Sequence, residues 1–276
     1  QPNSFHILGT TMVNARSGQG SGVRGRLLLL ALLFLIPSWA RAQVPSDKAK
    51  EVITAAIEAM GGESYVGFKN YHRQGRYFIF DQRGRQGFSR FFDWTAMEPI
   101  KWRFQLGEGK RQEVQIYNLE INKAWLLEGK NSVEEVSEEE IENFRKDVLR
   151  DIDVLLRSRV EEEGMSLFYY GPDDVTGSGE LEAVEFLDAT NSSVVIFFDL
   201  QSHLPTKMET HVTNQAGIRQ KKETEFYNWH NIQGIHTPLR TDYFTDGEKS
   251  QQVFVEEISY NVAIPPSHFL EPVPEK

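Results

Sequence analysis

The 276-residue sequence contains no cysteine. No disulfide can form, which excludes the small secreted scaffolds that depend on disulfides, and no cysteine is available for lipid attachment. The apolar run at residues 27–36 has only ten residues, about half of what a helix needs to cross a bilayer. We therefore expect a protein without a membrane span and without a lipid anchor.

Signatures of catalysis and of metal binding are also missing. The sequence has no Gly-x-Ser-x-Gly elbow, no P-loop and no His-Glu-x-x-His pair. His230 and His236 have no acidic or cysteine partner at the spacing of zinc ligands. The sequence predicts no enzyme activity, no cofactor and no metal site.

Basic residues are fewer than acidic ones: 30 Lys and Arg stand against 40 Asp and Glu, a net charge of −10. Such a chain repels nucleic acid over most of its surface, so no nucleic-acid partner is expected. Acidic residues gather at residues 134–142, and this block is either a solvated helix end or a docking surface for a basic protein.

One pattern that the sequence does contain is an export signal. Arg24 and Arg26 precede the apolar run, and Ala40-Arg41-Ala42 follows it. A basic start, a short apolar stretch and small residues at the cleavage site are typical of a secretory signal peptide. We expect residues 1–42 to be an extension and a signal peptide cleaved near Ala42. Residues 43–276 are expected to form one exported domain.

Two segments have helical periodicity. Apolar residues recur at helical spacing through residues 48–60, and Gly61-Gly62 follows as a stop signal. A second helix is predicted over residues 138–158, because Ser137 and Glu140 have the spacing of a capping box.

Most of the remaining chain alternates apolar and polar residues, the pattern of half-buried strands. Strands are expected at residues 71–81, 87–94, 99–107, 111–118, 122–129, 181–188, 193–199, 204–213, 219–229, 237–245 and 250–260, with a hairpin turn at Asp246-Gly247. Short connections favour antiparallel pairing, so the economical fold is one long, curved meander with the two helices over its concave face.

Large aromatic side chains are frequent on these strands and suggest an apolar cavity between sheet and helices. The candidate lipid-binding residues are Phe91, Trp102, Phe104, Trp125, Phe198 and Phe226. The second helix would cover the cavity as a lid, with an apolar stripe of Ile141, Phe144, Val148, Ile152 and Leu155. Such a cavity would bind lipid or acyl chains.

Several segments together resemble one family. They are residues 56–62 (AIEAMGG), 117–125, 195–208, 234–238 (GIHTP) and 261–265 (NVAIP), in this order along nearly the whole mature chain. In these features the sequence is similar to LolA-like outer-membrane lipoprotein-sorting proteins. The resemblance implies an α+β, mainly β fold: a curved antiparallel sheet forming an incomplete β-barrel with an α-helical lid. It also implies a periplasmic carrier of lipidated cargo.

The leading hypothesis is therefore a periplasmic carrier or binding protein for an acylated ligand, a lipoprotein or a lipid, working with inner- and outer-membrane transfer proteins. Burial of an acyl chain contributes about 0.8 kcal/mol per methylene and needs no polar motif. The alternative is a non-enzymatic periplasmic sensor or scaffold that binds a protein partner through residues 134–142.

Overall fold

The computed structural model describes residues 47–81, 84, 86–172, 174–175, 179–214 and 216–273. The expected signal peptide at residues 24–42 and its cleavage site lie outside the described residues. Within the described part of the chain, no helix is both long enough and apolar enough to cross a membrane.

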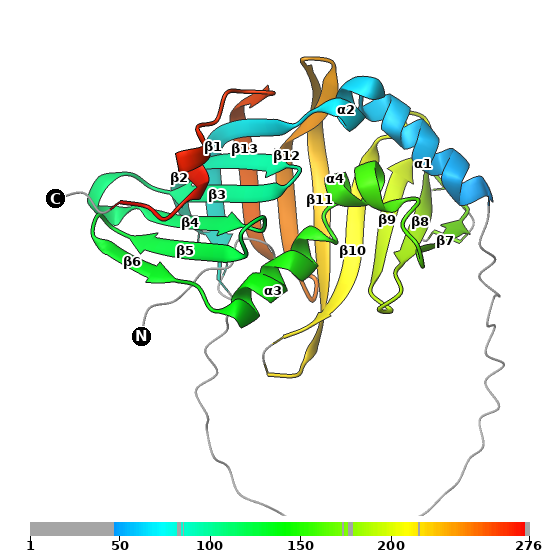
Figure 1. The fold of residues 1–276 in the computed structure, drawn as a ribbon. Helices are drawn as coiled ribbons and strands as arrows, with labels where there is room; N and C mark the ends of the chain where they lie inside the picture. The colour runs from blue at the N-terminus through cyan, green and yellow to red at the C-terminus, as the bar shows by residue number, and fades with distance from the viewer. Residues whose placement is uncertain are drawn as a thin grey trace, which may run out of the picture.

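The strands form one antiparallel sheet that curves around the helices without closing (Figure 1). Their bounds are β1 (Asn70–Phe80), β2 (Gln86–Met97), β3 (Ile100–Leu106), β4 (Glu113–Asn118), β5 (Lys123–Glu128), β6 (Ser132–Glu135), β7 (Ser166–Tyr170), β8 (Leu181–Leu187), β9 (Ser193–Asp199), β10 (Pro205–Thr213), β11 (Arg219–Ile232), β12 (Ile235–Thr245) and β13 (Glu248–Tyr260). The edge strands β6 and β7 are left unpaired with each other, so the barrel is incomplete.

The strand order differs from the single sequential meander that the sequence predicts. It runs β6-β5-β4-β3-β2-β1-β13-β12-β11-β10-β9-β8-β7, so two meanders meet where β1 pairs with β13. The connection between β6 and β7 crosses the concave face from one edge of the sheet to the other (Figure 1). Because this connection is helical and long, consecutive strands can lie at opposite edges.

The junction of the two meanders is bent by a bulge. The register between β1 and β13 shifts at Gln74/Gly75. A Cβ atom at Gly75 would lie 2.0 Å from the carbonyl oxygen of Phe254, so only glycine fits this close approach of two strands. A bulge increases the local twist, which helps the sheet to curl.

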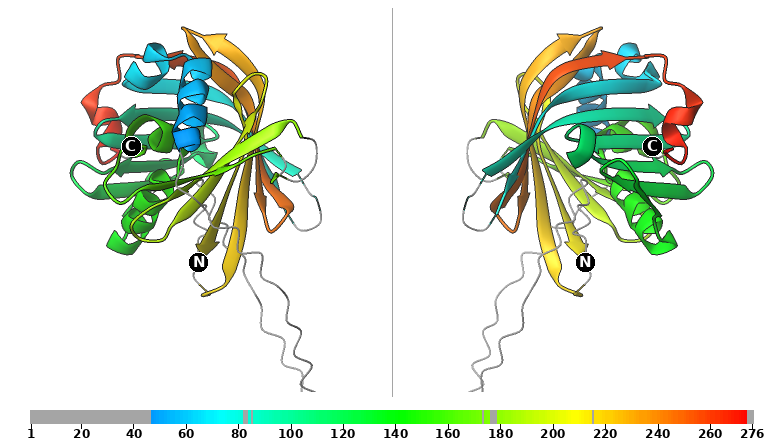
Figure 2. Two further views of the ribbon diagram at one scale, coloured as in Figure 1. Left: turned by 90° about the vertical axis from the view of Figure 1, so that its right-hand side faces the viewer. Right: turned by 90° about the vertical axis from the view of Figure 1, so that its left-hand side faces the viewer.

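The first predicted helix is α1 (Asp47–Met60), followed by the single turn α2 (Glu63–Gly67). The apolar face of α1 is buried against β7, β8 and β12, at one end of the concave face (Figure 2). Its buried residues are Ala49, Val52, Ile53, Ala56 and Met60.

The second predicted helix is broken. The capping box of Ser137 and Glu140 is present, but α3 (Glu138–Val148) ends ten residues earlier than expected. Asp151 has an extended backbone and its carboxylate accepts a hydrogen bond from the amide of Asp153 at 2.9 Å, which starts the short helix α4 (Ile152–Val154). A π-helical turn, η2 (Leu155–Arg159), follows. The prediction of one continuous helix was wrong because an internal Asp acts as a new N-cap.

Candidate functional site

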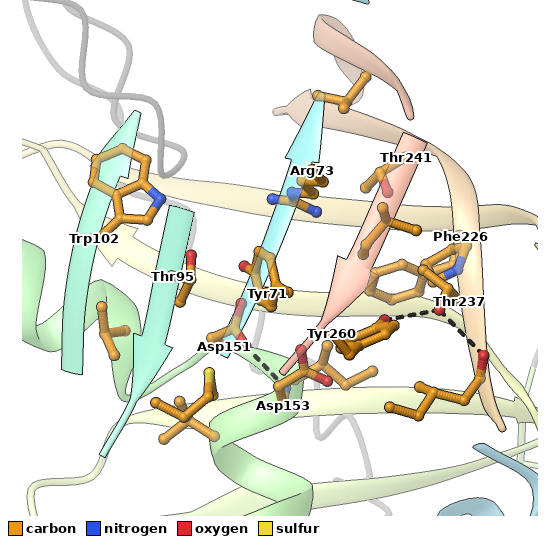
Figure 3. Close-up of a pocket in the computed structure, with 18 of the residues that line it drawn as sticks. Tyr71, Arg73, Thr95, Trp102, Asp151, Asp153, Phe226, Thr237, Thr241 and Tyr260 are labelled. Carbon is orange, nitrogen blue, oxygen red and sulfur yellow. Dashed lines mark hydrogen bonds between the residues drawn. The ribbon is translucent and has the colours of Figure 1, made fainter. Parts of the chain in front are cut away.

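A cavity of about 170 Å³ lies between the concave face of the sheet and the segment α3–α4, which we call the lid (Figure 3). Its walls come from β1, β2 and β3, from β11, β12 and β13, from the lid itself, and from Met60 of α1 and Tyr65 of α2. The apolar part of the wall consists of Phe91, Met97, Ile100, Trp102, Phe104, Phe144, Val148, Ile152, Phe226, Trp229 and Val253 among others.

Aromatic stacking holds the lid on the sheet. The Phe144 ring of α3 stacks on Tyr117 of β4 with ring centroids 4.0 Å apart, and on Trp102 of β3 at 5.4 Å. Trp102 in turn stacks on Phe104 at 5.5 Å. Stacked aromatic pairs add roughly 0.5–1.5 kcal/mol to the free energy of burial alone. Phe144 thus supplies the aromatic contacts of the lid, and Ile141, Val148 and Val154 are buried in the same cluster.

A second, more polar hollow of about 710 Å³ lies between α3 and the hairpin of β10 and β11. Trp102 and Phe144 line both hollows, so this stacked pair stands between the cavity and the wider groove. Displacement of Phe144 would join the two spaces.

Four of the six candidate lipid-binding residues lie together in the cavity wall: Phe91, Trp102, Phe104 and Phe226. Trp125 does not, because strand alternation places it on the other face. Its neighbour Ala124 is in register with Tyr117, which in turn faces Trp102, so Trp125 points away and packs with Ile116 in a separate cluster.

Phe198 also lies outside the cavity wall. It is fully buried in the core beneath α1, at the other end of the concave face. Of the predicted lid residues, Phe144, Val148 and Ile152 line the cavity, and Ile141 is buried in the same cluster as Phe144. Leu155 belongs to the core beneath α1 instead, because the break at Asp151 turns the chain.

The polar part of the wall was not predicted from the sequence. It includes Tyr65, Tyr71, Arg73, Tyr77, Thr95, Asp151, Asp153, Thr241, Tyr243 and Tyr260. Asp151 and Asp153 were expected within a continuous helix, where their spacing gives no signal of a site. Arg73 occupies an ordinary alternating position of a strand. Only the folded chain brings these residues to one space.

Arg73, whose side chain lines the cavity and is 30% exposed, forms an ion pair with Asp93. The guanidinium Nε lies 2.7 Å from Asp93 Oδ2, and the carboxylate is fully buried. Thr95 Oγ1 donates a hydrogen bond to Asp93 Oδ1 at 3.0 Å. Asp93 therefore has both a cation and a hydroxyl donor, as a buried carboxylate requires.

Two further carboxylates face the cavity from the lid. Burial, and next the neighbouring charge of Asp153, raise the pKa of Asp151 to about 7. Burial also raises the pKa of Asp153, while a hydrogen bond from the Tyr65 hydroxyl at 2.8 Å opposes the shift. A desolvated carboxylate without a strong cation partner favours its neutral form. Among the described residues, no group of side chains has the composition of a metal site.

Comparison with solved structures identifies the fold. A DUF1329 family protein from Desulfovibrio piger aligns with a TM-score of 0.54 and 12% identity, over 82% of this chain and 98% of that one. A LolA superfamily protein from Nitrosomonas europaea, NE2245, aligns with a TM-score of 0.49 and 11% identity, over 80% and 97%. No protein-family model and no curated protein matches the sequence.

At this identity the likeness concerns the fold alone. The architecture is an incomplete antiparallel barrel with a helical lid. It is the architecture that the resemblance to LolA-like proteins implies.

Proposed function

We propose that the protein is a periplasmic, non-enzymatic carrier or binding protein that holds acyl chains of a lipoprotein or lipid for transfer towards the outer membrane. One observation carries the proposal: a cavity with an aromatic wall lies between the curved sheet and the helical lid of α3 and α4. In this proposal residues 43–276 are a single lipid-binding domain.

The size of the cavity fits a carrier whose lid opens. An empty apolar cavity of roughly 150 Å³ can hold one benzene-sized molecule. The cavity of about 170 Å³ therefore accepts only a short stretch of hydrocarbon while the lid is closed. A longer chain needs Phe144 to leave Trp102, which opens the way into the adjoining groove. Each buried methylene then contributes about 0.8 kcal/mol.

A scaffold that binds a basic protein through residues 134–142 has weaker support. The structure gives several of these acidic residues a local role: Glu135 pairs with Lys123, Glu140 completes the capping box, and Glu142 pairs with Arg145. Native mass spectrometry of protein purified from its host separates the two functions. Co-purifying lipid favours the carrier, and a bound protein partner favours the scaffold.

The decisive test is a charge placed in the cavity wall. Trp102→Glu puts a carboxylate into a site where the parent side chain is 7% exposed, next to the rings of Phe104 and Phe144. A buried unpaired carboxylate costs several kcal/mol and repels hydrocarbon. We expect this variant to lose binding of an uncharged fluorescent acyl probe.

The matched control is the neighbouring residue on the opposite face. Lys101→Gln removes only an ion pair with the half-exposed Glu120, so probe binding should stay at the parent level. Thermal melts identify variants that remain folded. If folded Trp102→Glu bound the probe as tightly as the parent, the cavity would not be the lipid site.

A further inference from the structure

Asp151 is a feature of the cavity that a purely apolar cargo does not explain. Its side chain lines the cavity beside Tyr71 and Arg73 (Figure 3). Among the described residues its carboxylate forms no ion pair, and it accepts hydrogen bonds from the backbone amides of Asp153 and Val154 at the start of α4. The nearby guanidinium of Arg73 is held at 2.7 Å by Asp93. A carboxylate therefore faces the cavity without a cation of its own.

Two hydroxyl groups are independent evidence for a cargo with a polar head. Tyr77 and Thr241 line the cavity and are only 3% and 7% exposed. Within the described chain, neither side chain has a hydrogen-bond partner. Buried hydroxyls normally find a partner, because leaving them unpaired costs roughly 1–3 kcal/mol. A hydrocarbon cargo would leave them unpaired, whereas a cargo with a polar head can bring hydrogen-bonding atoms to them.

The chemistry of these groups selects one kind of polar head. An ammonium group has three donors and no acceptor, which suits a carboxylate and hydroxyl oxygens. The rings of Tyr71 and Tyr243 also line the cavity, and aromatic rings attract cations: the guanidinium of Arg73 lies 5.3 Å from the Tyr71 ring centroid. A carboxylate or phosphate head would meet Asp151 and Asp153, and it would have to compete with Asp93 for Arg73.

We propose that the cavity selects amphiphiles with an ammonium head, with Asp151 as the residue that binds the head and the aromatic wall around Trp102 as the site for the hydrocarbon. This inference rests on the proposed lipid-binding function and names the class of cargo. The raised pKa of Asp151 fits it, because burial in the empty cavity disfavours the charge that a bound cation would stabilise.

The test compares three probes of equal chain length. Dodecylamine, dodecanol and dodecanoic acid compete with an uncharged fluorescent acyl probe at pH 8, where Asp151 is mostly ionised. We expect the amine to bind about tenfold more tightly than the alcohol, equivalent to about 1.4 kcal/mol, and the acid to bind most weakly.

Asp151→Asn provides the matched variant. Asparagine is as good an N-cap as aspartate, so α4 should be retained. The variant should bind the amine no better than the alcohol. Glu161→Gln, which changes an exposed carboxylate paired with Lys50, should keep the full preference for the amine.

The outcomes separate the two proposals. Equal binding of amine and alcohol, tightest binding of the acid, or an amine preference that survives Asp151→Asn would overturn the ammonium site and leave the carrier function standing. Failure of all three probes and of the fluorescent probe would overturn the carrier function and the ammonium site together.

Discussion

The two ends of the concave face are covered by helices in different ways. Beneath α1 the core is closely packed, and Ile53, Val184, Ile196 and Phe198 are at most 1% exposed. Two of the five buried residues of α1, Ala49 and Ala56, are small and allow a close approach of helix and sheet. Beneath the lid, Phe144 holds the helix on the sheet through stacked rings, and a cavity remains. One sheet thus supports a structural core at one end and a binding site at the other.

The two ends of the concave face also differ in how they stabilise the charge of a carboxylate. At the end beneath α1, Asp199 caps the turn after β9, and the backbone amide and hydroxyl of Ser202 lower its pKa. In the cavity, burial raises the pKa of Asp151. Asp199 is stabilised as a carboxylate, and Asp151 is not. A binding site can contain a buried carboxylate whose charged form is disfavoured, because a bound ligand can provide the missing partner.

Deletion of one ring at each end should have the largest effect. Phe198→Ala leaves a void in a filled core and should lower the free energy of unfolding by about 3–5 kcal/mol. Phe226→Ala removes a partly exposed ring that already borders the cavity, so its cost should be at most about half as large. Denaturant unfolding monitored by circular dichroism gives both values. Equal losses would mean that the two ends are packed alike.

The pH dependence of stability should have opposite signs at the two carboxylates. The folded state holds a proton on Asp151 up to a pH of about 7, whereas the unfolded chain releases it near 3.9. The contribution of Asp151 to the free energy of unfolding should therefore fall as the pH rises from about 4 to 7, by a few kcal/mol at most. Asp151→Asn should gain stability relative to the parent across this window in thermal melts.

Asp199→Asn serves as the contrasting variant. Because the folded-state pKa of Asp199 is lowered, its contribution is present above the unfolded-state pKa and is lost as the pH falls through the folded-state value. The parent should thus be more stable than Asp199→Asn at neutral pH, with the difference disappearing in acid. Parallel pH profiles for the two variants would contradict the assignment.

The smallest effect is expected at the start of the lid. Ser137→Ala removes the side chain that accepts a hydrogen bond from the amide of Glu140, at a cost of about 1 kcal/mol. Hydrogen exchange should quicken in α3, while α1 keeps its protection. Probe uptake should also become faster if the lid opens for entry. Faster exchange in α1 would show that the two helices unfold as one unit.

Much of the fold could be predicted from local sequence. Alternation located most of the strands, the capping box located the start of α3, and Asp246-Gly247 forms the hairpin turn with both residues at positive φ. The strands β6 and β7 were missed because they are short edge strands with little alternation. Alternation also placed Trp102 and Phe104 on the helix-covered face, since successive side chains of a strand point to opposite faces.

The tertiary structure alone decided which distant segments meet. The pairing of β1 with β13 joins the two ends of the domain, and no local pattern encodes it. The break at Asp151 placed Leu155 beneath α1 and turned two carboxylates towards Arg73. The sequence determined which face each side chain of a strand takes, because that depends only on backbone geometry. The cavity depends on how two meanders and a broken helix pack together, and many long-range contacts set that arrangement at once.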